Sequence, residues 1–266
     1  MIDLFQVIVL ALIQGLTEFL PISSSAHLVI PSMVLGWPDQ GLAFDVAVHV
    51  GTLSAVLLYY RGELRQMAAD WFGSLAGRGH TEQSALVWYL ALATIPAGLV
   101  GLFGGDFIEE HLRTLPVIAG TTAAFGLLLG FADRRTGPVA SRALTLPVAL
   151  VIGLAQALAP VPGVSRSGIT ITAALLLGLS RQSAARFSFL LSIPIIASAG
   201  LLLLARLLQE QGPVDWLALG LGALLSGVSA YLCIAAFLRL FDRVGLMPFV
   251  YYRLGLAVVL LVIWLA

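Results

Sequence analysis

The chain has 266 residues, with 14 arginines, no lysine and 14 acidic residues, so its formal net charge is zero. Hydrophobic residues make up 59% of the chain and charged residues 11%, and the mean hydropathy is +1.00. A water-soluble domain carries roughly 25% charged residues, so most of this surface faces something other than water. No basic block indicates nucleic-acid binding. The single cysteine, Cys233, excludes an intrachain disulfide and a cysteine-rich metal site.

Residues 1–40 begin with an apolar run that leads into the motif EFLPISSSAH, Glu18 to His27. The run lacks the basic start and the small-residue cleavage site of a signal peptide, so we expect it in the mature protein. Glu18 and His27 lie within apolar sequence, where an ionisable side chain costs several kcal/mol unless it is paired or solvated. They are therefore candidate functional residues.

The serines of this motif fall at the expected start of a short helix. Ser23, Ser24 and Ser25 offer hydroxyl nucleophiles or phosphate ligands, and His27 is close enough to act as a general acid or base. Glu18 is a candidate ligand of a divalent cation, because hard cations choose carboxylate oxygens. The alternative is structural, because serines commonly cap helices and a histidine can be a hydrogen-bonded core residue. Combination with the second motif, described below, favours the functional interpretation.

Six later stretches are long and apolar enough for membrane-spanning helices, which need about 17–25 residues. They cover about residues 42–60, 83–104, 115–132, 184–206, 215–238 and 246–266. Between the first two, apolar and charged residues separate onto two helical faces over residues 61–78, which predicts an interfacial amphipathic helix. Asp45 and His49, four residues apart on the first span, either support a site or form a plain intrahelical bond. Arg253 follows Pro248 closely and is expected to reach the membrane interface.

The second motif, PGVSRSG, starts at residue 162 and has the features of an anion site. Gly163 allows a tight turn of the backbone. The start of the next helix, which attracts phosphate, gains hydroxyl and amide donors from Ser165, Ser167 and Gly168. Arg166 adds a planar donor that can bind two phosphate oxygens and keeps its charge. A capping serine beside an arginine that extends to the interface is the alternative, and the position between two apolar runs disfavours it.

The two motifs align with each other at an offset of 142 residues. The matched pairs include Gln14 with Gln156, Ser23 with Ser165, Ser24 with Arg166 and Ser25 with Ser167. Both motifs follow an apolar run, contain proline and lead into a shorter apolar run, which is typical of discontinuous helices in two repeated halves. We therefore expect one membrane domain over residues 1–266, with one repeat at about 1–132 and a second at about 143–266.

The placement of arginine orients the spans. Ten of the 14 arginines fall at four connections, near residues 61–78, 134–142, 181–186 and 239–243, which we place in the cytoplasm. The connections at 104–115 and 206–215 are mainly acidic and are expected outside. Six spans fit this pattern only if residues 1–40 enter and leave on the outer side and residues 143–182 on the inner side. This predicts an all-α membrane protein with two re-entrant helical hairpins and an inverted-topology repeat; two further full spans are the alternative.

At these motifs the sequence resembles the bacterial undecaprenyl-diphosphate phosphatases, also called bacitracin-resistance proteins. The resemblance covers nearly the whole chain through QGLTEFLPISSSAH, PGVSRSGITIT, RFSFLLSIP and PFVYYRL. It implies hydrolysis of undecaprenyl diphosphate to undecaprenyl phosphate and inorganic phosphate with Mg²⁺ or Ca²⁺, which recycles the lipid carrier of peptidoglycan synthesis. It also implies a homodimer in the bacterial inner membrane, with the active site facing the periplasm.

The resemblance further implies roles for single residues. These are metal-binding or acid–base carboxylate for Glu18, nucleophile for Ser24, partner of the nucleophile for His27 and phosphate clamp for Arg166. The other motif residues, Ser23, Ser25, Gly163, Ser165, Ser167 and Gly168, are expected to bind substrate. Gln14 stands where many family members have glutamate, which leaves open whether it is a second metal ligand. Ala26 stands where glycine is common, which narrows the freedom of the turn.

A transporter is the alternative function. Inverted repeats with broken helices at the membrane midplane are also typical of secondary transporters, and a lipid flippase would share that architecture. Transport of an anion would need Arg166 and the helix ends, but not His27 together with three serines. The full set of residues therefore favours a phosphatase.

Overall fold

The structure is a computed structural model that describes residues 2–136, 142–207 and 215–266. In these ranges the chain forms eleven α-helices and no strand. The six long helices are α3 (Leu42–Tyr59), α5 (Glu82–His111), α6 (Leu115–Arg135), α9 (Arg181–Leu207), α10 (Trp216–Val244) and α11 (Met247–Leu265). The shorter helices are α1 (Leu4–Thr17), α2 (Ser24–Leu35), α4 (Arg61–Leu75), α7 (Leu146–Gln156) and α8 (Arg166–Leu176).

All six predicted spans are helices long and apolar enough to cross a membrane. Only 22–44% of each apolar window is buried within the protein, so most of its apolar side chains point outward. Phe103 of α5, for example, is 80% exposed. An outward apolar surface of this extent is stable in lipid and not in water, and the expected all-helical membrane architecture is confirmed in this form.

The prediction that residues 104–115 form a non-helical connection is wrong for most of its length, whereas their location outside the membrane stays a prediction. Helix α5 continues through Asp106, Glu109 and Glu110 and ends at His111. The sequence interpretation ended the helix where the apolar run ended. Charged side chains do not break a helix, however, because glutamate is a good helix former, so hydropathy marks the end of a span and not the end of its helix.

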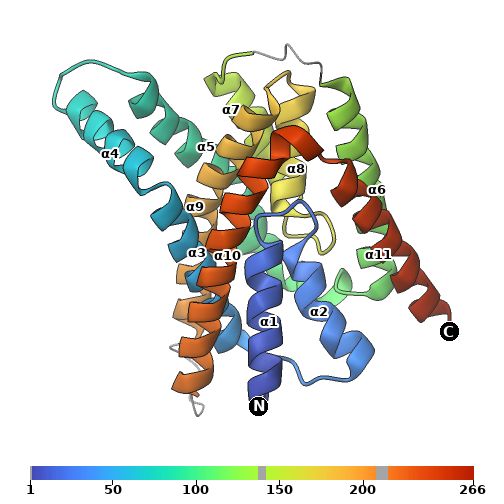
Figure 1. Ribbon diagram of the computed structural model, residues 1–266. Coiled ribbons are helices and arrows are strands. Elements are labelled where there is room, and N and C mark those ends of the chain that lie inside the picture. The colour runs from blue at the N-terminus through green and yellow to red at the C-terminus, as the bar shows by residue number, and fades with distance from the viewer. Residues whose placement is uncertain (1, 137–141, 208–214) are drawn as a thin grey trace.

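Two short helical hairpins meet inside the bundle. In Figure 1, α1–α2 occupies the lower half of the molecule and α7–α8 the upper half. Their tips, residues 18–26 and 157–168, face each other. The tips are in contact: the amide of Gly163 donates to Ser23 Oγ at 3.3 Å, and Ser167 Oγ donates to the carbonyl of Leu20 at 2.8 Å. Segments about 140 residues apart therefore share one polar centre.

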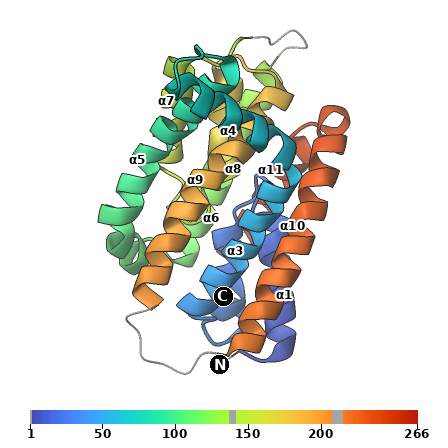
Figure 2. The same cartoon turned by 90° about the vertical axis from the view of Figure 1, so that its left-hand side faces the viewer.

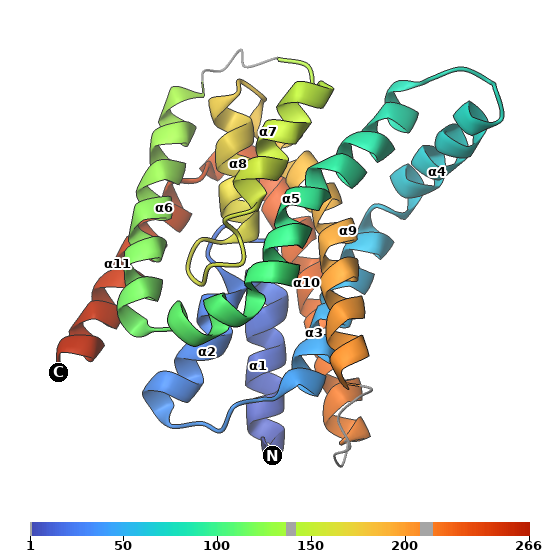
Figure 3. The same ribbon diagram turned by 180° about the vertical axis from the view of Figure 1, so that it is seen from behind.

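The long helices surround this centre. Helix α3 lies between α9 and α10 (Figure 2), and α6 packs along α11 (Figure 3). A glycine allows the closest of these contacts, since a Cβ at Gly51 of α3 would lie 2.2 Å from the carbonyl oxygen of Ala223 in α10. Phe189 of α9 joins the hairpin tip to the core, because its ring lies 5.4 Å from that of Phe19 and 5.6 Å from that of Phe237.

Helix α4 projects from the rest of the bundle at the upper left of Figure 1 and packs along α5. Its Met67 is buried, whereas Phe72 and Leu75 on the same apolar face are exposed. Glu63 at its start forms an ion pair with Arg186 of α9. The helix occupies most of the predicted 61–78 segment, and its location at a membrane surface stays a prediction.

Candidate functional site

The two hairpin tips have the same local geometry. Ser23 and Ser165 cap α2 and α8, and they are the two non-glycine residues with positive φ, 74° and 72°, in the part of the chain that the structure describes. Their Oγ atoms accept from the amides of Ala26 at 3.4 Å and Gly168 at 3.1 Å. Each of these four residues lies 142 positions from its counterpart. A positive φ costs a serine of the order of 1–3 kcal/mol, and such strain is concentrated at functional sites.

Ser25 and Ser167 complete the two caps. The Oγ of Ser25 lies 3.2 Å from that of Ser23, and the Oγ of Ser167 lies 3.3 Å from that of Ser165. Both helices thus begin with a pair of hydroxyls beside the first backbone N–H groups, which have no acceptor within the helix. A helix start of this kind favours an anion.

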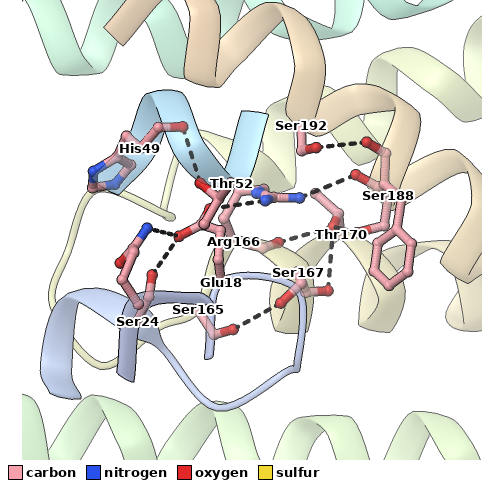
Figure 4. A network of polar contacts seen from close by, with 12 residues as sticks. Glu18, Ser24, His49, Thr52, Ser165, Arg166, Ser167, Thr170, Ser188 and Ser192 are labelled. Atoms are coloured by element: carbon pink, nitrogen blue, oxygen red, sulfur yellow. Dashed lines mark hydrogen bonds and ion pairs between the residues drawn. The ribbon is translucent and has the colours of Figure 1, made fainter. Parts of the chain in front are cut away.

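Glu18 links the first tip to the second (Figure 4). Its Oε1 accepts from Arg166 Nη2 at 3.0 Å, and its Oε2 accepts from Ser24 Oγ at 2.7 Å and from Gln14 Nε2 at 3.0 Å. Glu18 is 8% exposed and the side chain of Arg166 11%. The carboxylate therefore has hydrogen bonds from a hydroxyl, an amide and a guanidinium in a largely buried setting.

Arg166 is held in place from a third side. Its Nη1 donates to the carbonyl of Ser188 in α9 at 3.1 Å, and its guanidinium carbon lies 5.7 Å from the ring centre of Phe19. The hydroxyls of Thr170 and Ser188 share a 2.7 Å hydrogen bond beside it. Ser188 was not predicted, and its role is visible only once α8 and α9 are packed together.

A cavity of about 560 Å³ opens at this centre. Six predicted site residues line it: Glu18, Ser23, Ser24, Ser25, Ser165 and Arg166. The remaining wall comes mainly from small and apolar residues of α5 and α9, including Gly98, Gly101, Leu102, Gly105, Ile195, Ile196, Ala199 and Leu202. A polar end beside an apolar wall suits a ligand with a charged head and a hydrocarbon chain.

His27 lies apart from this lining. Its Nδ1 is 2.7 Å from the carbonyl of Ser23 and its Nε2 is 2.6 Å from the hydroxyl of Tyr252 in α11, on which the ring is stacked. Gly163, Ser167, Gly168 and Gln14 are also not among the described residues that line the cavity. Both ring nitrogens of His27 have partners, so in this conformation His27 fixes the turn at Ser23.

His49 of α3, in contrast, lines the cavity together with Glu18 and Arg166. Its Nδ1 bonds to the backbone carbonyl of Asp45 at 2.7 Å, while the Asp45 carboxylate accepts from Gln40 at 3.0 Å. His49 therefore does form an intrahelical bond to Asp45, but with its backbone carbonyl and not with its carboxylate, and it also lies at the site. Spacing along a helix could not show that α3 turns His49 toward the two tips.

Arg253 does not reach the membrane interface as expected. It is 0% exposed and donates to backbone carbonyls of α6 and of both tips. The expectation was wrong because it considered only the distance from Pro248 along the helix. Carbonyl groups freed by the broken helices offer this side chain a closer set of acceptors.

The residues at the tips offer few ligands for a divalent cation. Among the described residues no group of three or more histidine, cysteine and carboxylate side chains could hold a metal ion. Gln14, which is 0% exposed, nevertheless has an Oε1 without a hydrogen-bond partner, next to Glu18. Mg²⁺ commonly binds one or two protein oxygens and takes its other ligands from phosphate and water. Glu18 and Gln14 meet that minimal requirement.

Comparison with known proteins identifies the family of this chain. The family described as bacitracin resistance protein BacA matches residues 7–259. A protein from Teredinibacter turnerae named undecaprenyl-diphosphatase is 58% identical over 98% of this chain and 99% of its own length. Proteins of the same name from Colwellia psychrerythraea and Saccharophagus degradans are 61% and 58% identical over 96% and 99% of this chain, and 97% and 100% of their own lengths. The chain therefore belongs to the bacitracin resistance protein BacA family.

Proposed function

We propose that this multi-pass membrane protein hydrolyses undecaprenyl diphosphate to undecaprenyl phosphate and inorganic phosphate, and so recycles the lipid carrier for peptidoglycan synthesis. The proposal is supported by relatives named undecaprenyl-diphosphatase that match over nearly their full lengths. The observation that carries it is the contact of Ser24 and Arg166 with one buried carboxylate, Glu18, at a cavity with an apolar wall. The same comparisons support a phosphatase and not the transporter alternative.

Arg166 and the starts of α2 and α8 would neutralise the diphosphate, since each presents donors to the cavity. The hydroxyl of Ser24 would then attack the terminal phosphorus. A bond forms from Ser24 Oγ to phosphorus, the bridging oxygen bond breaks, and undecaprenyl phosphate leaves. Water then attacks the phosphoserine and releases inorganic phosphate. Direct attack by water, with Ser24 as a ligand only, is the other route.

Glu18 is the base that the geometry favours for Ser24, because Oγ already donates to its carboxylate at 2.7 Å. His27 stays a proposed partner of the nucleophile. Its contact with the Ser23 carbonyl would hold the backbone beside Ser24. To transfer a proton to substrate, the ring would first have to leave the hydroxyl of Tyr252.

We propose Mg²⁺ or Ca²⁺ as the cofactor, held by Glu18 and Gln14 Oε1 and completed by diphosphate oxygens and water. The cation would supply positive charge to the leaving and attacking oxygens. The remaining predicted residues, Ser23, Ser25, Gly163, Ser165, Ser167 and Gly168, would bind phosphate oxygens through hydroxyl and amide donors or shape the turns that do so.

Two features support a re-entrant, inverted arrangement of the two halves in the bacterial inner membrane. The tips repeat one local geometry at an offset of 142 residues, and the two hairpins approach each other from opposite ends of the bundle (Figure 1). The arginine-rich connections then face the cytoplasm and the cavity serves the periplasmic side. A homodimer stays a prediction of the family resemblance.

The test is phosphate release from undecaprenyl diphosphate by the purified protein, with chelator and after addition of Mg²⁺ or Ca²⁺. We expect release that chelation abolishes and cation restores. Arg166→Ala should abolish it without unfolding the protein in detergent, and Arg166→Lys should be poor, because an ammonium cannot replace a two-pronged donor. Absence of release by the parent protein would sink the proposed function, and near-parent release by Arg166→Lys would contradict the clamp.

A further inference from the structure

Arg253 of α11 is a charged side chain buried inside the membrane domain. It is 0% exposed, and it does not line the cavity. No carboxylate of the described residues forms an ion pair with it. A buried charge of this kind is costly unless its donors are satisfied, and within membrane domains such residues are functional by default.

Backbone carbonyls satisfy all of its donors. Nε donates to Thr122 at 3.1 Å; Nη1 donates to Pro21 at 3.1 Å and to Val164 at 3.2 Å; Nη2 donates to Gly163 at 2.8 Å and to Val164 at 3.1 Å. A guanidinium has five N–H groups, which equals the number of these bonds. One side chain thus joins α6, the first tip and the second tip.

The acceptors follow the internal repeat. Pro21 and Gly163 occupy corresponding positions in the two tips, because 21 + 142 = 163. Two glycines leave room for the guanidinium and its stem: a Cβ at Gly168 would lie 3.0 Å from Nη1, and a Cβ at Gly126 would lie 3.1 Å from the Cβ of Arg253. The space between the tips therefore fits an arginine side chain closely.

We propose that Arg253 is a positioning residue that clamps the two tips together, so that Ser24 on one and Arg166 on the other both keep their contact with Glu18. Its catalytic consequence rests on the proposed function, whereas the clamp itself does not. Arg253 touches neither the cavity nor the three reacting groups. It acts through the backbone at Pro21, three residues before Ser24, and at Val164, two residues before Arg166.

The experiment combines catalysis with local accessibility. Arg253→Met keeps an unbranched, flexible stem, which is shorter than that of arginine, and removes every donor. Arg253→Lys keeps the charge with three donors in place of five. Arg61→Met is the matched control, since Arg61 also donates to a backbone carbonyl, that of Leu58 at 3.0 Å, but at an exposed site. A cysteine at Val164, which is 1% exposed, reports opening of the second tip in a Cys233→Ser background, and a cysteine at the buried Ala149 reports general loosening.

We expect Arg253→Met to lower the rate of phosphate release on the order of a hundredfold, because small displacements of reacting groups have effects of that size. Maleimide labelling at position 164 should become at least about tenfold faster, and labelling at position 149 should not change. For Arg253→Lys, the rate of phosphate release and the rate of labelling at position 164 should both lie between those of the parent and the Met variant. If the Met variant does not fold, the Lys variant alone decides the test. Parent-level release by Arg253→Lys, or unchanged labelling at position 164 in either variant, would overturn the clamp. If the parent releases no phosphate, the proposed function fails while the labelling still decides the clamp.

Discussion

Ser24 differs from the neighbouring serines in what its hydroxyl contacts. Its Oγ donates to Glu18, whereas Ser23 Oγ accepts from Ala26 and Gly163 and bonds with Ser25. The rate of phosphate release should fall on the order of a hundredfold or more for Ser24→Ala, as is common when a nucleophile or its base is lost.

Ser23→Ala and Ser25→Ala are the matched variants, and each should lose on the order of tenfold, which corresponds to one or two kcal/mol of hydrogen bonding. All three rates are measured with the same metal and detergent. A dead Ser25→Ala beside a mild Ser24→Ala would show that the attacking group is misassigned.

Glu18 has two proposed duties, as base for Ser24 and as cation ligand. Glu18→Gln keeps the shape of the side chain but removes the charge, so it should both slow hydrolysis and raise the cation concentration needed for half-maximal rate. Glu109→Gln is the control, because Glu109 also lines the cavity but pairs with Arg113 at 3.3 Å. If Glu18→Gln responds to Mg²⁺ as the parent does, the carboxylate has another role.

The sequence predicted that the two motifs meet, but it grouped His27 with the nucleophile and did not show every partner of the motif residues. Glu18, Ser24 and Arg166 do come together, because an unpaired charge in an apolar segment needs a polar partner and few were available. The sequence shows Arg253 and His49 only along their own helices, whereas their roles depend on which way α11 and α3 face. The family resemblance includes the PFVYYRL segment, which contains Tyr252 and Arg253. This segment was the sequence signal that could have indicated a role for Arg253.

At the scale of helices, hydropathy found every long span and misjudged where α5 ends. It could not show how closely helices approach. Gly153 of α7 is an example, since a Cβ there would lie 2.5 Å from the carbonyl oxygen and 2.6 Å from the Cα of Ala93 in α5. The backbones themselves touch, so a side chain could fit only if the helices separate.

Gly153→Ala should therefore lower the free energy of unfolding by about 1–3 kcal/mol, the usual range for overpacking. Gly120→Ala is the control: Gly120 lies in the long helix α6, where an added Cβ meets nothing within 4 Å, and alanine there should be neutral or stabilise by up to about 1 kcal/mol. Thermal unfolding in one detergent compares them. Equal midpoints for the two variants would mean that α5 and α7 are not in contact as described.

At the scale of the whole molecule, the sequence predicted an orientation from arginine alone, and the fold makes that prediction sharper. Helix α4, the end of α6, the start of α9 and the end of α10 lie toward one end of the bundle in Figures 1 and 3, and they carry eight of the 14 arginines. Asp133 joins two of them, because it pairs with Arg181 at 2.7 Å and accepts from the amide of Leu246 at 3.2 Å. The fold thus gathers most of the arginines toward one end of the bundle, and the side of the membrane that this end faces decides the orientation.

The side of the membrane that each end of the bundle faces can be measured by labelling single cysteines in a Cys233→Ser background. Asp39, Glu109 and Arg135 are all exposed, so a cysteine at any of them can react wherever the reagent is present, and differences report sidedness and not burial. The first two belong to the α2–α3 connection and the end of α5, and Arg135 ends α6 at the opposite end of the bundle. Because positive charge is retained in the cytoplasm, an impermeant maleimide added to intact cells should label positions 39 and 109, and position 135 only after the membrane is permeabilised. Labelling of position 135 alone in intact cells would reverse the proposed orientation, and equal labelling of positions 109 and 135 would contradict it. Either result would also contradict periplasmic access to the cavity.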